Sequence, residues 1–258
     1  MTAAEAITLQ PMPLHAPSAA SPVRPGELIT FRRPMRYSAV WALQQHFHAE
    51  RLEGTRSDTL ILLEHLPVYT AGRRTKPGHI KPECTSTDIP VEAVSRGGSV
   101  TYHGPGQLIA YPIFALTHHA PGVKAYVGML EEVLIRTLRC WDIQGHRLEK
   151  APGVWTRSQH REVKIASIGA RLERGITLHG FALNVNNDLA PFSRIVPCGL
   201  EGCRMTSMAE MLQMEIPLHL VAERVAEAFS TIFHLEWTTS SESRMTLNET
   251  VAAATQEP

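Results

Sequence analysis

The feature that most constrains the fold is an alternation of short strand-like stretches with longer amphipathic ones. Residues 28–31, 59–63, 108–114 and 163–168 are short, apolar segments, and the apolar side chains alternate over residues 181–185. Segments of this kind predict strands. No segment repeats along the chain, so a solenoid is excluded. The order fits an α+β architecture, in which helices flank one mixed sheet.

Helices are predicted between and after these strands. Residues 37–47 and 127–141 place apolar side chains at steps of three and four, which is the spacing of a helix with one buried face. Ser207 and Glu210 have the spacing of a capping box that opens a short helix. Residues 217–233 begin with proline and continue with another apolar stripe. The last third of the domain is therefore predicted to be helical.

The two ends of the chain differ from its middle in composition. Residues 1–26 contain five prolines and six alanines with almost no charge, and residues 239–258 contain seven Ser or Thr among twenty. Neither end carries an apolar periodicity that could pack against a core. We therefore expect a disordered extension over 1–26, a single folded domain over 27–238 and a flexible tail over 239–258.

The composition of the 258 residues excludes several classes of partner. The 25 basic side chains balance the 25 acidic ones, so there is no excess of positive charge for nucleic acid or an anionic membrane. No apolar run approaches the roughly 18 residues of a membrane span. A secretory or mitochondrial targeting signal would carry basic residues, but no Lys or Arg precedes Arg24. The four cysteines are too few and too irregularly spaced to predict a disulfide framework. We expect a cytoplasmic protein with reduced thiols.

A glycine-rich segment, R-G-G-S-V-T-Y-H-G-P-G-Q, occupies residues 96–107. Glycine permits a positive φ and a close approach of the backbone to a ligand, so this loop could present amide groups to an acyl or phosphate oxygen. Its order matches neither a phosphate-binding loop nor a dinucleotide-binding turn. A tight hairpin with an exposed His103 is the alternative interpretation.

Lys164 opens an otherwise apolar strand-like stretch, K-I-A-S-I-G-A-R, at residues 164–171. An ammonium group is costly to bury without a partner, so a partner for Lys164 is to be sought. The alternative is a lysine at the end of a strand whose amine reaches water.

Cys198 lies in the sequence Pro197-Cys198-Gly199, where proline fixes one φ and glycine frees another. Such an elbow can hold a thiol toward a cleft. A free thiol is only about 3% thiolate at pH 7, and a nearby ammonium would raise that fraction. A small buried hydrophobe is the alternative role. The C-x4-C spacing of Cys198 and Cys203, with no paired histidines, does not favour a metal site.

Together these segments resemble the octanoyltransferase family, the lipoyl(octanoyl) transferases of endogenous protein lipoylation. The resemblance rests on residues 96–107, on residues 164–171, on H-G-F-A-L-N at 179–184 and on P-C-G at 197–199, all in the family's order. L-E-H-L-P-V-Y-T at 63–70 is also similar to the family's pattern, and the likeness covers about residues 28–235. It implies the mixed sheet of the biotin and lipoyl protein ligases.

The resemblance also implies roles for individual residues. It identifies Cys198 as the acyl-thioester nucleophile and Lys164 as the residue that lowers the pKa of the cysteine and accepts a proton. The substrate-binding wall that it implies consists of Arg96, Gly97, Gly98, Ser99, Val100, Thr101, Tyr102, His103, Ser167, Ile168, Gly169, Gly180, Phe181 and Ala182.

The substrates implied by the resemblance are octanoyl-acyl carrier protein as donor, and the lipoyl domains of 2-oxoacid dehydrogenase E2 subunits and the glycine cleavage H protein as acceptors. Exchange of one thioester for another keeps the acyl group activated, so no cofactor is expected. Three alternatives remain: an ATP-dependent lipoate-protein ligase of the same fold, a non-catalytic module that binds lipoyl domains or acyl carrier protein, and a thioesterase.

Overall fold

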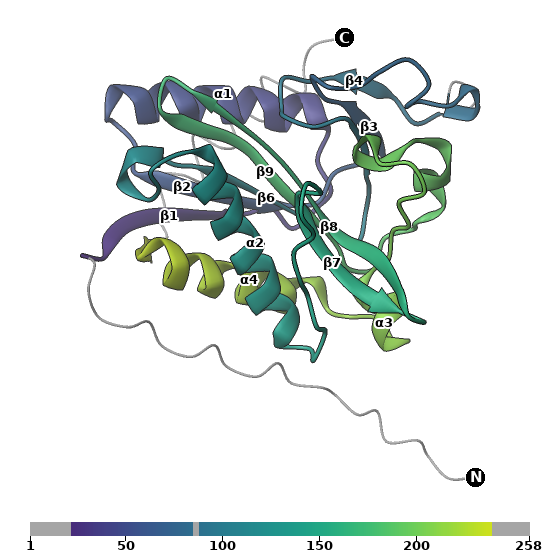
Figure 1. Ribbon diagram of the computed structural model, residues 1–258. Helices are drawn as coiled ribbons and strands as arrows, with labels where there is room; N and C mark the ends of the chain where they lie inside the picture. Colours follow the sequence, from purple (N-terminus) through teal and green to yellow (C-terminus); the bar gives the residue numbers. More distant parts are fainter. Residues whose placement is uncertain (1–21, 85–87, 239–258) are drawn as a thin grey trace.

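A seven-stranded sheet and a three-stranded sheet form the framework of the protein. The computed structural model describes residues 22–84 and 88–238 (Figure 1). In the large sheet the strand order is β10-β1-β2-β6-β9-β8-β7. These strands are β1 (Arg24–Thr30), β2 (Asp58–Leu63), β6 (Gln107–Ile113), β7 (Gly153–Ser158), β8 (Arg161–Glu173), β9 (Ile176–Asn184) and β10 (Leu235–Thr238).

The large sheet mixes parallel and antiparallel pairs. At one edge β1 runs parallel to both β10 and β2, whereas every pair from β2 to β7 is antiparallel. The small sheet has the order β4-β3-β5 and contains β3 (Val68–Ala71), β4 (Val91–Ala93) and β5 (Val100–His103). The predicted mixed sheet with flanking helices is confirmed.

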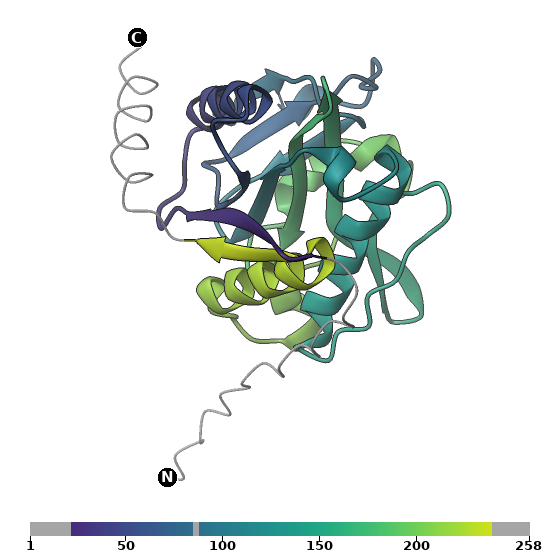
Figure 2. The same ribbon diagram turned by 90° about the vertical axis from the view of Figure 1, so that its left-hand side faces the viewer.

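Helices cover both faces of the large sheet (Figure 2). The long helices are α1 (Tyr37–Glu53), α2 (Val123–Arg139) and α4 (Leu218–Phe233); the shorter ones are α3 (Met208–Leu212), η1 (Pro82–Cys84), η2 (Leu116–His118), η3 (Ala190–Arg194) and η4 (Pro197–Gly199). Strand β2 shows how the sheet divides the core. Ile61 and Leu63 pack toward α1, while Leu60 and Leu62 pack in the cluster that includes α2 and α4, because successive side chains of a strand point to opposite faces.

The predicted helix signals hold in part. The Ser207 hydroxyl accepts a hydrogen bond from the Glu210 amide at 3.1 Å, which is one half of the predicted capping box. The other half of the capping box does not form, because the Glu210 carboxylate accepts a hydrogen bond from Thr206 instead.

The boundary drawn at residue 26 needs a correction. Strand β1 begins at Arg24, so residues 24–26 belong to the sheet, where they pair with β10. The predicted strand at 28–31 omits the first residues of β1, because Pro25 and Gly26, which lies beside Trp237, are residue types that rarely occur within strands. The remainder of the expected extension before residue 22 and the expected tail from residue 239 lie outside the described residues.

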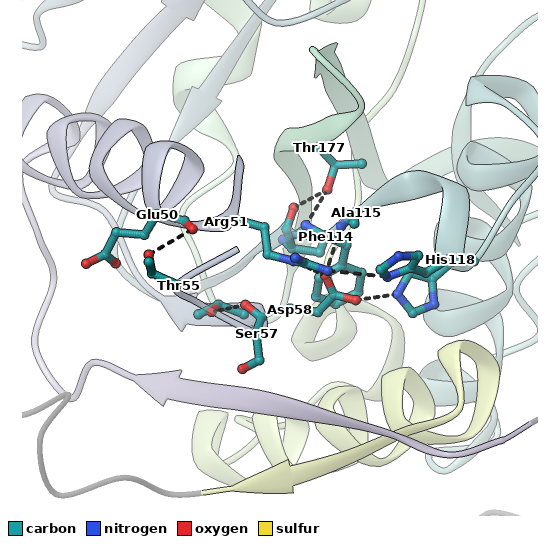
Figure 3. Close-up of polar contacts among 12 residues, drawn as sticks. Glu50, Arg51, Thr55, Ser57, Asp58, Phe114, Ala115, His118 and Thr177 are labelled. Carbon is teal, nitrogen blue, oxygen red and sulfur yellow. Dashed lines mark hydrogen bonds and ion pairs between the residues drawn. The ribbon is translucent and has the colours of Figure 1, made fainter. Parts of the chain in front are cut away.

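A buried carboxylate links α1, β2 and η2 at the start of β2 (Figure 3). Asp58 accepts hydrogen bonds from Arg51 Nε at 2.7 Å, from the Ala115 amide at 2.8 Å and from His119 Nε2 at 2.6 Å. Burial alone would raise the pKa of Asp58, but the hydrogen bonds from His119 and Arg51 outweigh it and lower the pKa. This network fixes the chain that leads into α2.

Candidate active site

A pocket of about 460 Å³ lies where β8 and β9 of the large sheet meet the glycine-rich segment, η4 and the first turns of α2. Ser167, Gly169 and Phe181 of the sheet line it, together with Val123 and Val127 of α2. Cavities of this size accommodate small-molecule ligands. The pocket collects the segments that the sequence singled out.

Cys198 lines this pocket from η4. Its φ is +57°, a conformation that side chains other than glycine rarely adopt, and its thiol donates to Ser167 Oγ at 3.6 Å. The next residue, Gly199, has φ +70°, and a Cβ there would lie only 2.9 Å from His79 Cε1. Two consecutive left-handed residues thus turn the sulfur toward β8, and such strain is typical of functional sites.

Lys164 lines the same pocket from β8 and is fully buried. Its amine donates a hydrogen bond to the Pro152 carbonyl at 2.7 Å and lies 5.0 Å from the centre of the Trp155 ring. The alternative of a strand-end lysine that reaches water is therefore wrong. The carbonyl and the aromatic face stabilise the buried ammonium.

The backbone brings Lys164 and the Cys198 elbow together. The Lys164 amide donates to the Arg204 carbonyl at 2.8 Å, and the Lys164 carbonyl accepts from the Thr206 amide at 2.9 Å. The segment that leaves the elbow is thereby fastened alongside β8. Burial raises the pKa of Cys203 to about 11. The charge of Lys164 acts to lower this pKa, and the charge of Cys198 acts to raise it. The Lys164 amine and the Cys198 thiol are thus both close enough to Cys203 for their charges to act on it.

Arg96 organises the glycine-rich segment from within. Its guanidinium donates to the Thr70 carbonyl at 2.5 Å and hydroxyl at 2.8 Å, and to the Ser99 carbonyl at 2.7 Å. Burial lowers its pKa, while the charge of Cys198 acts in the opposite direction. Glycine is required across from it, because a Cβ on Gly169 would lie 2.8 Å from Arg96 Cδ. The side chain therefore fixes the loop and places positive charge near the sulfur.

His103 is buried, which contradicts the alternative of an exposed hairpin histidine. Its Nδ1 donates to Gln107 Oε1 at 2.8 Å, and its Nε2 accepts from the Thr70 hydroxyl at 3.2 Å. Burial lowers its pKa well below the ordinary value, as do the charges of His65 and Arg96. A neutral His103 with both ring nitrogens engaged holds the glycine-rich segment in place.

Most of the predicted substrate wall lies at the pocket. The members that line it are Arg96, Gly97, Gly98, Ser99, Thr101, His103, Ser167, Ile168, Gly169, Gly180, Phe181 and Ala182. Val100 and Tyr102 do not line it and are a correction to the predicted set. They alternate with Thr101 and His103 along β5 and so point to the other face, where they pack in a separate apolar cluster.

Several pocket residues were missed by the sequence reasoning. Tyr37 and Tyr111 line the pocket, and Tyr37 Oη lies 3.5 Å from His179 Nδ1. His179 also stacks on Trp41 with ring centres 4.9 Å apart, and burial lowers its pKa to about 3. His179 was part of a recognised motif, which was a usable signal. Tyr37 and Tyr111 had only the apolar spacing of core residues.

The described part of the chain holds neither a candidate metal site nor a helix that could span a membrane. Among these residues no group of three His, Cys, Asp or Glu side chains is arranged to hold a metal ion. None of the described helices has the length and apolarity needed to cross a bilayer.

A protein-family match and two solved structures define the class of protein to which this fold belongs. Residues 36–230 match the family described as the lipoyl protein ligase A/B catalytic domain. Two solved structures share the fold at 15% identity. They are a bi-partite lipoate protein ligase from Thermoplasma acidophilum (TM-score 0.69, covering 90% of this chain and 94% of that one) and lipoate-protein ligase A bound with ATP (0.68, 91% and 97%).

Within this class of lipoyl protein ligase domains, the curated relatives with similar sequences are octanoyltransferases. The octanoyltransferase of Thermobifida fusca is 47% identical over 188 residues, which cover 71% of this chain and 78% of the relative. Those of Chloroflexus aurantiacus (strain J-10-fl) and Synechococcus elongatus are 43% and 40% identical, with 78% and 86% of this chain and 91% and 94% of the relatives covered. The chain belongs to the octanoyltransferase family and is an acyltransferase.

Proposed function

We propose that this protein transfers an octanoyl group from octanoyl-acyl carrier protein to the acceptor lysine of a lipoyl domain, through a thioester on Cys198. The observation that carries the proposal is the joint placement of a strained cysteine and a buried lysine at one pocket. The 2-oxoacid dehydrogenase E2 subunits and the glycine cleavage H protein are the proposed acceptors. The proposed compartment is the cytoplasm, where a thiol stays reduced.

In the first half of the reaction, the Cys198 thiolate attacks the carbonyl carbon of the octanoyl thioester. The new bond between sulfur and carbon replaces the bond to the carrier's sulfur, and the carrier leaves as a thiolate that takes up a proton. In the proposed reaction Lys164 and Arg96, which line the same pocket as Cys198, supply the positive charge that assists a thiolate nucleophile. Since one thioester replaces another, the step needs no nucleotide.

In the second half, the acceptor lysine attacks the Cys198 thioester. This amine must lose a proton, and Lys164 in its neutral form would accept it while Cys198 leaves as a thiolate. Acylation removes the negative charge of the sulfur, and departure of Cys198 as a thiolate restores it for the next cycle.

The acyl chain has an apolar surface to occupy beside the sulfur. Val123, Val127 and Phe181 line the pocket together with Leu200, which follows the elbow. Burial of each methylene contributes about 0.8 kcal/mol, so a medium-length chain gains several kcal/mol there. Thr101 also lines the pocket, and its buried hydroxyl has no hydrogen-bond partner among the described residues.

Intact-protein mass spectrometry with octanoyl-acyl carrier protein and a lipoyl domain tests the proposal. The enzyme alone should gain one octanoyl mass, which then moves to the lipoyl domain. Transfer only from free octanoate with ATP would favour the ligase alternative. Release of free octanoate with an unmodified lipoyl domain would indicate a thioesterase, and binding without any mass change would indicate a non-catalytic module.

A further inference from the structure

The charges around the pocket are of one sign. The basic residues that line it are Arg74, Lys76, Arg96, Lys150 and Lys164, and no Asp or Glu is among the described residues that line it. Arg96 and Lys164 are buried and already have roles within the site. The other three are exposed and therefore lie at the mouth. Around a chain whose charges balance overall, this asymmetry points to an anionic ligand.

The three cations of the mouth, Arg74, Lys76 and Lys150, make no ion pair within the described part of the chain. Other arginines of this chain do pair, such as Arg51 with Asp58 and Arg147 with Glu131. The charge of the mouth is therefore not neutralised by described neighbours and is available to a ligand.

The backbone that carries Arg74 and Lys76 is fixed close to Cys198. The Arg74 amide donates to the Gly98 carbonyl at 3.0 Å, and the Lys76 amide donates to His79 Nδ1 at 3.3 Å. His79 Nδ1 also accepts from the Ser99 hydroxyl at 2.6 Å, and its carbonyl accepts from the Val196 amide at 2.8 Å. This loop is clamped between the glycine-rich segment and the elbow.

Lys150 approaches from another part of the chain. It precedes Ala151 and Pro152, both of which line the pocket, and the Pro152 carbonyl holds the amine of Lys164. Two separately anchored segments thus contribute cations to one mouth.

We propose that Arg74, Lys76 and Lys150 form a phosphodiester subsite that holds the phosphopantetheine arm of the acyl donor at the pocket mouth. This inference rests on the proposed function. An octanoyl thioester carries no charge at its acyl end, so an anion on the donor must lie in the arm that presents it. The phosphodiester of that arm is such an anion, and long basic side chains at the mouth suit it.

Nucleotide phosphates share this chemistry, so the experiment must distinguish the two sources. We would compare octanoyl-phosphopantetheine with octanoyl-pantetheine, which differ only in the phosphate, and measure kcat/KM by thiol release in the presence of a lipoyl domain. The variants are Arg74→Gln, Lys76→Gln, Lys150→Gln and the triple combination. Arg139→Gln, an exposed arginine at the end of α2, is the matched control.

Wild-type protein should prefer the phosphorylated donor, and the triple variant should lose about tenfold in kcat/KM for that donor alone. Added salt should weaken the preference in the wild type but not in the triple variant. The Arg139→Gln variant should behave as wild type.

Two outcomes would overturn the subsite. One is equal use of both donors by the wild type, and the other is an equal loss for both donors in the triple variant. In either case acyl transfer itself would still stand. Absence of acceptor modification with every donor would instead refute the proposed function, and modification that requires free octanoate with ATP would assign the mouth to nucleotide phosphates.

Discussion

The replacement Lys164→Met separates the two halves of the proposed reaction. Methionine is unbranched and apolar, so it can occupy the buried space of the lysine stem, but it cannot accept a proton. Loss of a positioned general base lowers rates by about 100- to 10,000-fold. The discharge of octanoyl-Cys198 to the lipoyl domain should slow by this factor, because the acceptor amine then has no proton acceptor at the site.

The structure also sets the expected effect of Lys164→Met on stability. The Pro152 carbonyl loses the donor that lies 2.7 Å away, which costs about 1–3 kcal/mol for a buried acceptor. The buried ammonium, whose desolvation opposes folding, is removed at the same time. The free energy of unfolding should therefore fall by no more than about 3 kcal/mol. The folded protein should remain available for kinetic measurement.

Single-turnover mass spectrometry checks this prediction. The Lys164→Met protein should acquire the octanoyl mass on Cys198 more slowly than the wild type, because it lacks the cation beside the sulfur, and should keep that mass when a lipoyl domain is added. Arg161→Met changes an exposed arginine on the same strand and should leave both steps as in the wild type. Transfer by a folded Lys164→Met protein at a rate within tenfold of the wild type would refute the role of Lys164 as proton acceptor.

Three further predictions follow from the same geometry. Cys198→Ala should show no octanoyl adduct in intact-mass spectra, and a stable adduct would place the acyl group elsewhere. Gly199→Ala should destabilise the elbow by about 1–3 kcal/mol and slow acylation, because its Cβ would contact His79; Gly202→Ala, which has the same φ of +70° but open space, should slow acylation far less. Burial lowers the pKa of His65 to about 4. The contribution of neutral, buried His65 to the free energy of unfolding is therefore fully present above pH 6.5 and is lost as the pH falls toward 4. His65→Gln should remove roughly 3 kcal/mol of that pH dependence in denaturation curves.

The motifs predicted the location of the site because they mark backbone constraints. Gly199 adopts the positive φ that glycine permits after Pro197 and Cys198, whereas the positive φ of Cys198 has no signal in the sequence. Lys164 has the partner that its burial requires. Val100 and Tyr102 were included because a motif is contiguous, whereas a strand sends alternate side chains to opposite faces. The limits of a motif therefore do not define the limits of a pocket wall.

Other residues carried no local signal. Tyr37 occupies a helical position typical of a core residue, and only the packing of α1 on the sheet brings its hydroxyl to His179. The cations of the mouth are likewise separated in sequence, with Arg74 and Lys150 on different loops. Convergence of this kind depends on long-range topology, which the spacing of residues along the chain does not encode.

The pairing of β1 with β10 affects how the protein reaches its native state. Arg24 lies opposite Leu235, so this edge of the sheet joins segments from the two extremes of the described chain. Contacts between such distant segments form slowly, because a very long loop must close first. During synthesis β1 leaves the ribosome long before β10 has been made. The side of β1 that does not pair with β2 therefore has no partner until β10 emerges. That side of β1 remains an open sheet edge until residues 235–238 have been made.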